Sequence, residues 1–133
     1  MARYYRDDQQ CDYANGAGQE AKSIAGSGLI LANCSDSYVY TAPVASFGKN
    51  PFGLFDMLGN VWEWTQDCWH ENYNNAPTDG SAWLNTNGGD CSRRVIRGGS
   101  WISDPQDLRS ANRLRYGTDF AFDGVGFRIA RAL

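Results

Sequence analysis

With 133 residues, the chain is long enough for one domain with its own core, but it is small for an enzyme with an enclosed active site. Its 12 Lys and Arg stand against 15 Asp and Glu, which gives a net charge of -3 and argues against nucleic acid as a partner. No apolar run approaches the length of a membrane span, so none is expected.

The first third of the chain predicts little regular structure. Residues 11–28 are loop-like, with one weak helical patch at Gln19–Ile24. Leu29–Ala32 is a short apolar strand candidate. Ser37–Val44 alternates and ends near a proline, which is typical of an edge or terminal strand.

The middle of the chain predicts a strand that carries two tryptophans. A turn at Asn50–Gly53 leads to a single helical turn at Leu54–Leu58 and then to a strand at Val61–Thr65. Trp62 and Trp64 lie two residues apart, so they share one face of that strand. Large aromatic side chains in this pattern indicate core anchors.

A long polar loop, His70–Asp90, follows. One histidine does not make a metal site, and we expect His70 to be exposed. Strand candidates come at Arg94–Arg97 and Gly126–Ala130, and Gly98–Gly99 predicts positive φ or a close backbone approach. The predicted fold class is α+β, rich in strand and coil, with residues 1–133 in a single domain.

The four cysteines form two local pairs, Cys11 with Cys34 and Cys68 with Cys91. Each pair flanks a polar loop that a disulfide could close. Sequence does not choose among the three connectivities that four cysteines allow, but the spacings differ from the short pairs of a zinc site. We favour two local disulfides over free thiols. They would imply an oxidising compartment, the surface of a cell or virion, or a thermophilic source.

Arginines crowd the last third of the chain. They are Arg93, Arg94, Arg97, Arg109, Arg113, Arg115, Arg128 and Arg131. One interpretation is a basic binding strip. The favoured one is that these side chains pair with the abundant carboxylates and with backbone carbonyls.

Four ordered motifs carry a resemblance to a known family. They are "NPFGLFDMLGNVWEW" from Asn50, "RVIRGGSW" from Arg94, "RSANR" from Arg109 and "GFRIAR" from Gly126. In this order and spacing they closely resemble the sulfatase-modifying-factor family, typified by formylglycine-generating enzymes. The resemblance implies a C-type-lectin-like fold. It also implies that the family's first strand and two helices would precede Met1, so that a preceding segment or a partner chain would complete the domain.

The enzymes of this family use a cysteine pair as a copper-binding oxidase site. The resemblance places Ser103 and Leu108 at those positions, and neither can supply a thiolate. No copper is therefore expected. Ser100 and Ser110 have no histidine partner nearby in sequence, so a hydrolase triad has no support. We expect no catalytic residues here. The alternative interpretation is an enzyme of the sulfatase-modifying type, or a domain derived from one, whose chemistry needs residues that are not in this chain.

The resemblance also implies two structural calcium sites, in which oxygen atoms on tight loops would hold the ion. The first would use the side chains of Asn33 and Asp36 with the carbonyls of Cys34 and Tyr38. The second would use Glu63 with the carbonyls of Leu58, Gly59 and Val61. Asn33 and Asp36 are also ordinary turn formers, so both interpretations of the first loop stay open.

Residues 102–125 have no period of 2 or 3.6. Their place at the C-terminus resembles the variable region of the proteins diversified by diversity-generating retroelements. Adenine mutation there converts Asn codons into a set that lacks Met, Gln, Lys, Glu and Trp. Those types, roughly a fifth of ordinary composition, are absent from the candidate positions. The candidates are Ile102, Ser103, Asp104, Asp107, Leu114, Tyr116, Gly117, Thr118, Phe120, Ala121, Phe122, Asp123, Gly124 and Val125.

Aromatic residues in this segment suggest an anchor for a protein or cell-surface target. Tyr116, Phe120 and Phe122 lie in a polar, glycine-containing stretch without a core period. The alternative is that Phe120, Phe122 and Val125 cap the core beneath a loop. We favour a non-catalytic ligand-binding protein that presents residues 102–125 as its variable surface.

Overall fold

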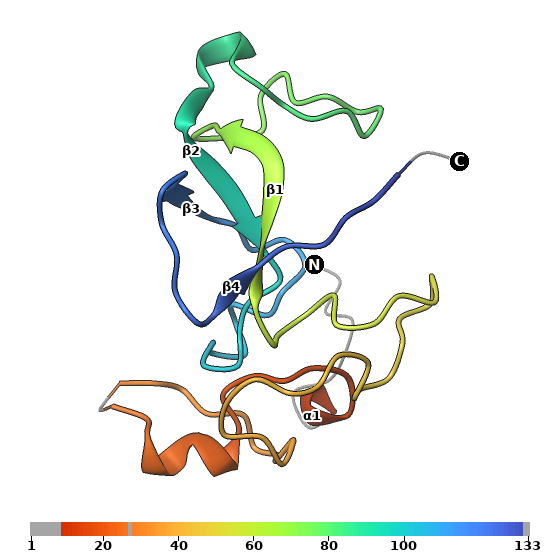
Figure 1. Ribbon diagram of the computed structural model, residues 1–133, viewed down its shortest axis with the longest axis vertical. Helices are drawn as coiled ribbons and strands as arrows, with labels where there is room; N and C mark the ends of the chain where they lie inside the picture. Colours follow the sequence, from red (N-terminus) through yellow and green to blue (C-terminus); the bar gives the residue numbers. More distant parts are fainter. Residues whose placement is uncertain (1–8, 27, 132–133) are drawn as a thin grey trace.

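The computed structural model describes residues 9–26 and 28–131. Its elements are α1 (Gln10–Tyr13), the 3-10 helix η1 (Gln19–Ser23), β1 (Trp62–Trp69), the 3-10 helix η2 (Thr86–Gly88), β2 (Asp90–Arg97), β3 (Leu114–Gly117) and β4 (Val125–Gly126). Figure 1 shows the strands in one curled sheet, with the loop-rich N-terminal residues, red to yellow, forming a layer at its lower end. The predicted strand- and coil-rich class is confirmed.

The sheet has the strand order β3-β2-β1-β4. β2 pairs antiparallel with both β1 and β3, whereas β4 runs parallel to β1. Ile96 of β2 lies opposite Trp64 on one side and Leu114 on the other. Because successive side chains point to opposite faces, β3 directs Leu114 and Tyr116 to one face and Arg115 to the other.

The core lies where the sheet meets the N-terminal layer. Its large apolar residues are Trp62, Val95, Ile96, Trp101 and Leu108, joined from the N-terminal side by small alanines. Trp62 is therefore a core residue, as predicted. Trp64 is only partly buried and borders an open cavity, so the two tryptophans do not act as a joint anchor.

Gly59 allows the sheet and the N-terminal layer to approach each other closely. Gly59 has φ of 78°, and a Cβ added there would lie 2.0 Å from the carbonyl oxygen of Asn15. The backbone N–H of Asn60 donates to that same oxygen at 2.8 Å. Gly98 and Gly99, with φ of 97° and 82°, confirm the predicted positive-φ pair.

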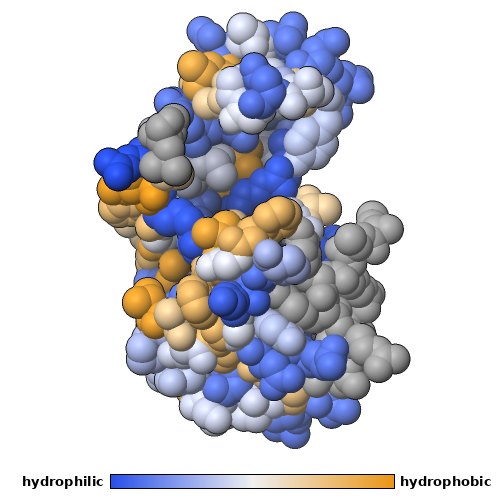
Figure 2. Space-filling model, turned by 90° about the vertical axis from the view of Figure 1, so that its right-hand side faces the viewer, coloured by the Kyte–Doolittle hydropathy of each residue, from blue (hydrophilic) through white to orange (hydrophobic). Residues whose placement is uncertain are grey.

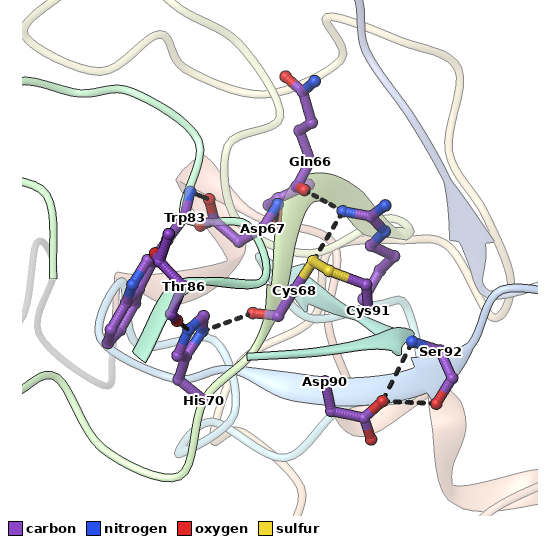
Figure 3. Close-up of a disulfide and its surroundings, with 11 residues drawn as sticks. Gln66, Asp67, Cys68, His70, Trp83, Thr86, Asp90, Cys91 and Ser92 are labelled. Atoms are coloured by element: carbon purple, nitrogen blue, oxygen red, sulfur yellow. Dashed lines mark hydrogen bonds between the residues drawn. A yellow bond between two sulfur atoms is a disulfide. The ribbon is translucent and has the colours of Figure 1, made fainter. Parts of the chain in front are cut away.

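Both predicted disulfides are present. Cys11 is joined to Cys34 and Cys68 to Cys91, with Cα–Cα distances of 6.0 and 4.5 Å. The second disulfide links the end of β1 to the start of β2 and so closes the long loop between them (Figure 3).

His70 is buried, so the prediction of an exposed loop residue is wrong. Only 4% of its surface is exposed. Its ring stacks on Trp83 with centroids 3.5 Å apart, and its nitrogens face the carbonyl oxygens of Cys68 and Thr86 at 3.1 and 2.8 Å (Figure 3). The long loop therefore has a small core of its own, which its polar composition concealed.

Three predicted elements of the first half are absent. Leu29–Ala32 and Ser37–Val44 are irregular, and Leu54–Leu58 forms no helix. These segments are held by isolated contacts in place of a ladder. For example, the Asn60 side chain accepts the backbone N–H of Ala42 at 3.0 Å and donates to its carbonyl at 3.2 Å. The predicted patch at Gln19–Ile24 does form, as η1.

The last third differs from prediction in two strands. β3 was not predicted, because its four residues, LRYG, are too few to establish a strand period. Of the predicted strand Gly126–Ala130, only Gly126 belongs to β4. The chain leaves the sheet where Arg128 turns to pair with Glu63 and to donate to nearby carbonyls.

Candidate ligand-binding site

A hollow of about 490 Å³ lies beside the predicted variable segment. Trp62 of β1 borders it from the core, and Ile24 and Leu29 form a wall from the N-terminal layer. Predicted ligand-binding residues supply much of the remaining lining: Ile102, Ser103, Asp104, Asp107, Leu114 and Phe122. The fold thus brings residues from separate parts of the segment to one place. The wall residues were missed, because no local spacing relates them to it.

Two carboxylates hold the loops around the hollow. Asp104 Oδ1 accepts the backbone N–H of Ile30 at 3.0 Å, which ties the wall to the predicted variable segment. Asp107 Oδ1 accepts the amide N–H of Asn112 at 3.0 Å. A carboxylate can accept about four hydrogen bonds, so both retain acceptor capacity toward a ligand.

Ser103 lies beneath the surface. It is 6% exposed, and its Oγ accepts the backbone N–H of Ser100 at 2.9 Å. Its carbonyl accepts the backbone N–H of Ala17 at 3.1 Å. Ser103 therefore braces the floor of the hollow between the segment and the N-terminal layer.

An aromatic row leads away from the hollow. The rings of Tyr116 and Phe120 are stacked, with centroids 4.0 Å apart and 6° between planes. Phe122, which lines the hollow, follows at 5.5 Å from Phe120. Phe120 and Phe122 are 37% and 38% exposed, so the row is a rigid apolar surface in contact with solvent.

The other predicted ligand-binding residues lie at the margin of this surface. Thr118 and Asp123 are exposed, and the backbone N–H of Thr118 donates to the Ser92 carbonyl at 3.3 Å. Val125 is partly buried in β4, opposite Trp62. Val125 thus belongs to the sheet more than to the exposed row.

The positions assigned to the enzymes' cysteine pair are closed. Ser103 and Leu108 are both buried, and Leu108 is 4% exposed. A Cβ added to Gly99 or Gly16 would lie 2.4 or 2.6 Å from a methyl carbon of Leu108, so this side chain fills the space between them. The protein's cysteines are all in disulfides.

The first predicted calcium loop contains unpaired oxygen atoms. Asp36 is buried, and its oxygens accept the backbone N–H groups of Gly16 and Tyr38 at 3.1 and 2.8 Å. The pKa of its carboxyl is raised to about 6, mainly by burial and partly by the charge of Glu20, while those two hydrogen bonds act in the opposite direction. Both carboxylate oxygens of Glu20 are buried without a hydrogen-bond partner, and so is Oδ1 of Asn15.

These oxygen atoms fit a hard cation better than the predicted set does. Asn33 is exposed, and the Cys34 carbonyl accepts the backbone N–H of Gln19 at 2.9 Å. Glu20 and Asn15 were missed because the Cys11–Cys34 disulfide, not a sequence spacing, closes the loop around Asp36. Within residues 9–26 and 28–131, no three His, Cys, Asp or Glu side chains cluster, so amides and carbonyls would have to complete the site.

The second predicted calcium site does not fit an ion in this arrangement. The Glu63 carboxylate accepts two hydrogen bonds from Nε of Arg128, at 2.8 and 2.7 Å. Arg128 also donates to the carbonyls of Phe55 and Asp56. The guanidinium therefore already neutralises the carboxylate. The pKa of Arg128 is raised, mainly by its hydrogen bonds to Glu63.

A second cavity, of about 450 Å³, lies between β1 and the loop that precedes it. Its apolar lining includes Phe52, Leu54, Met57 and Trp64. Apolar side chains also gather across the middle of the face shown in Figure 2. A hollow separates this apolar patch from the upper part of the molecule. In the described ranges, no helix is long and apolar enough to cross a membrane.

Residues 2–133 match the family description "Sulfatase-modifying factor enzyme 1-like domain". A formylglycine-generating enzyme of Mus musculus is 36% identical over 105 residues, which cover 71% of this chain and 25% of that enzyme. The chain spans between 14% and 38% of the length of the relatives and solved structures compared.

Two solved structures share the arrangement of the chain. PvdO from Pseudomonas aeruginosa has a TM-score of 0.71 and 40% identity, over 88% of this chain and 38% of PvdO. Treponema denticola variable protein 1 has a TM-score of 0.59 and 25% identity, over 90% of this chain and 36% of that protein.

Proposed function

The chain belongs to the family of sulfatase-modifying factor enzyme 1-like domains, and within it we propose that this member is a non-catalytic binding protein. Its ligand would contact the hollow beside Trp62 and the row formed by Tyr116, Phe120 and Phe122. The observation that carries the proposal is the convergence of predicted variable positions on one half-exposed surface. Stacked aromatic rings are rigid, so they lose little entropy when a partner covers them.

The partner class follows from the shape and chemistry of that surface. It is an open, mixed apolar and carboxylate surface, which suits a protein or cell-surface target. The likeness to a variable protein of Treponema denticola supports this class. Two disulfides are compatible with a location outside the cell or on its surface, where such a target would be met.

The gene offers the most direct test. We expect an adenine-rich near-copy of the coding segment for residues 102–125, beside a reverse transcriptase gene. Sequences from many cells should differ mainly at the candidate positions, while Arg94–Trp101 and Gly126–Arg131 stay constant. A locus without such a copy, or substitutions spread evenly over the chain, would refute the assignment.

The alternative function is an enzyme-derived domain of the sulfatase-modifying type. The likeness to a formylglycine-generating enzyme favours it. However, Ser103 and Leu108 give no thiolate at the positions assigned to the oxidase cysteines, so copper chemistry of that kind lacks its ligands. Turnover of a thiol-bearing peptide in the presence of copper, absent without it, would establish the enzyme and remove the binding proposal.

We further propose that calcium braces the loop around Asp36. The buried, unpartnered oxygens of Glu20 and Asn15 beside this loop support the proposal, because hard cations bind carboxylate and amide oxygens. The ion would hold the N-terminal layer against the site and would take no part in chemistry. Glu63 is not part of this proposal, since Arg128 already occupies its carboxylate.

A further inference from the structure

A cluster of arginines and aromatic rings lies on the sheet face opposite the proposed variable surface. Arg113 precedes β3, and its guanidinium carbon lies 4.1 Å from the centroid of the Trp69 ring and 4.7 Å from that of Tyr73. Arg115 of β3 lies over Trp69 as well, at 4.6 Å. Since Leu114 and Tyr116 point to the other face, the cluster is separate from the hollow.

The cluster carries an excess of positive charge. Arg97 donates to the Tyr73 hydroxyl at 2.6 Å, which adds a third guanidinium. The carboxylate bonded within the cluster is Glu71, whose Oε1 accepts Nε1–H of Trp69 and N–H of Arg115, each at 3.0 Å. The cluster thus holds three guanidinium groups, whereas Glu71 belongs to a side chain that is 77% exposed and Asp90 lies at the margin near Arg115.

Arg113 differs from its neighbours in having no acceptor. Arg97 donates to the carbonyls of Ser110 and Asn112, and Arg115 is paired with Glu71. Among the residues that the structure describes, Arg113 stacks on ring faces and forms no hydrogen bond, although its charge also acts on the nearby Glu71 carboxylate. A guanidinium held over aromatic rings keeps its N–H donors free in its own plane, a geometry that matches a carboxylate.

We propose that Arg113, with Arg115 and Trp69, binds an acidic side chain of a partner protein. Glu71 shows the chemistry, because the indole N–H and Arg115 already hold a carboxylate at this place. A partner carboxylate would pair with the free edge of Arg113 and would compete with Glu71 for Arg115. A polyanion such as nucleic acid is disfavoured by the net charge of -3 and by Glu71 and Asp90 nearby.

The test uses the whole chain and an acetylated, amidated tetraglutamate peptide as the probe. Binding is followed by NMR, through the Trp69 indole and Arg113 side-chain N–H signals. We expect saturable shifts, and we expect Arg113→Gln to weaken binding about tenfold, in line with the loss of a paired guanidinium. Arg113→Lys should weaken it nearly as much, because lysine keeps the charge but loses the planar fork.

Arg93→Gln is the matched control. It removes the same charge from the same sheet, but Arg93 is already paired with Asp90 and lies outside the ring cluster. Equal weakening by Arg93→Gln and Arg113→Gln would overturn the proposal, since the effect would then be general charge. Glu71→Gln should strengthen peptide binding by removing the internal competitor, and weaker binding would overturn it too.

Two further probes distinguish the ligand class. Inorganic phosphate and an oligothymidylate are titrated under the same conditions. If either binds Arg113 more tightly than the peptide does, the assignment to a protein carboxylate is overturned. Thermal unfolding of each variant is measured alongside. The site is also refuted if a substitution of Arg113 changes neither the melting temperature nor the affinity for the peptide.

Discussion

Asp36 is the residue whose ionisation opposes folding most clearly. Its pKa is about 6 in the folded protein against an ordinary 3.8, mainly because burial disfavours the charge. A carboxyl with a raised pKa binds its proton more tightly in the folded state than in the unfolded state. Its contribution to stability is therefore fully present below about pH 4 and is lost as the pH rises through 6.

The pH dependence of unfolding tests this assignment. With a chelator present, Asp36 should lower the free energy of unfolding by up to about 3 kcal/mol between pH 4 and 7, at 1.36 kcal/mol for each unit of pKa. Urea unfolding of the natural chain and of Asp36→Asn is compared at several pH values. The difference between them should change with pH over this window, and a constant difference would mean that another group titrates.

Calcium should reverse that destabilisation at neutral pH. A cation beside Glu20 and Asp36 favours the charged carboxylates, and a ligand at a hundredfold excess over its Kd stabilises by about 2.7 kcal/mol. We expect millimolar calcium at pH 7.5 to raise the urea midpoint, and Glu20→Gln or Asp36→Asn to abolish the rise. Asp79→Asn, an exposed turn carboxylate bonded to Ser81, is the control. An unchanged midpoint in the natural chain would contradict the proposed ion.

At the scale of an element, β3 and the turn after it separate two surfaces. Leu114 lines the hollow, and Tyr116 and Phe120 form the aromatic row beside it. Arg113 and Arg115 lie in the ring cluster on the other face. A short strand pairing only with β2 can do this because alternation sends neighbours to opposite faces. Substitutions on one side should therefore leave the other unaffected.

The aromatic row gives an element-scale prediction. Phe120→Ala and Phe122→Ala should each cost about 1 kcal/mol of stability or less, because both rings are more than a third exposed. The control Ile96→Ala, at a fully buried position, should cost about 2–5 kcal/mol. Denaturant unfolding measures all three. A cost for either Phe variant near that of Ile96→Ala would show that the row is core, the alternative interpretation.

Sequence predicted some elements well for identifiable reasons. The strand at Val61–Thr65 was predicted because aromatic and β-branched residues cluster there, and the disulfide pairing because each pair flanks one loop. β3 and the buried ring of His70 were not predicted. Both depend on partners far along the chain, the free edge of β2 and the face of Trp83.

For the whole molecule, motif order predicted more than periodicity did. The predicted C-type-lectin-like fold of the formylglycine-generating type is confirmed by the family match and by the solved structures. Local pattern failed over residues 29–44 because that stretch is held by single contacts, such as Asn15 to the Tyr40 carbonyl. Such bonding produces no strand period in the sequence. Only the family resemblance could therefore predict how residues 29–44 fit into the fold.

The molecule also has an apolar edge beyond β4. Phe127 and Ile129 are 73% and 87% exposed, on either side of Arg128, which is held by Glu63. β4 pairs with β1 through two residues. Among the described residues, the chain that follows continues no ladder, and it carries exposed apolar side chains. Such an edge favours association.

We therefore expect the 133-residue chain to self-associate as its concentration rises. The double variant Phe127→Ser, Ile129→Thr should associate only at a concentration about tenfold higher, which is equivalent to about 1.4 kcal/mol of association free energy. Sedimentation velocity measures both. Leu84→Ser is the control, because Leu84 is an exposed apolar residue of the long loop between β1 and β2. If the control suppresses association as strongly as the double variant, general surface hydrophobicity is responsible and the edge is not. If only the double variant suppresses association, the edge is responsible. In the associated state, the amides of residues 126–130 should then be protected from hydrogen exchange, because the partner pairs with the backbone and covers the apolar side chains at the same sheet edge.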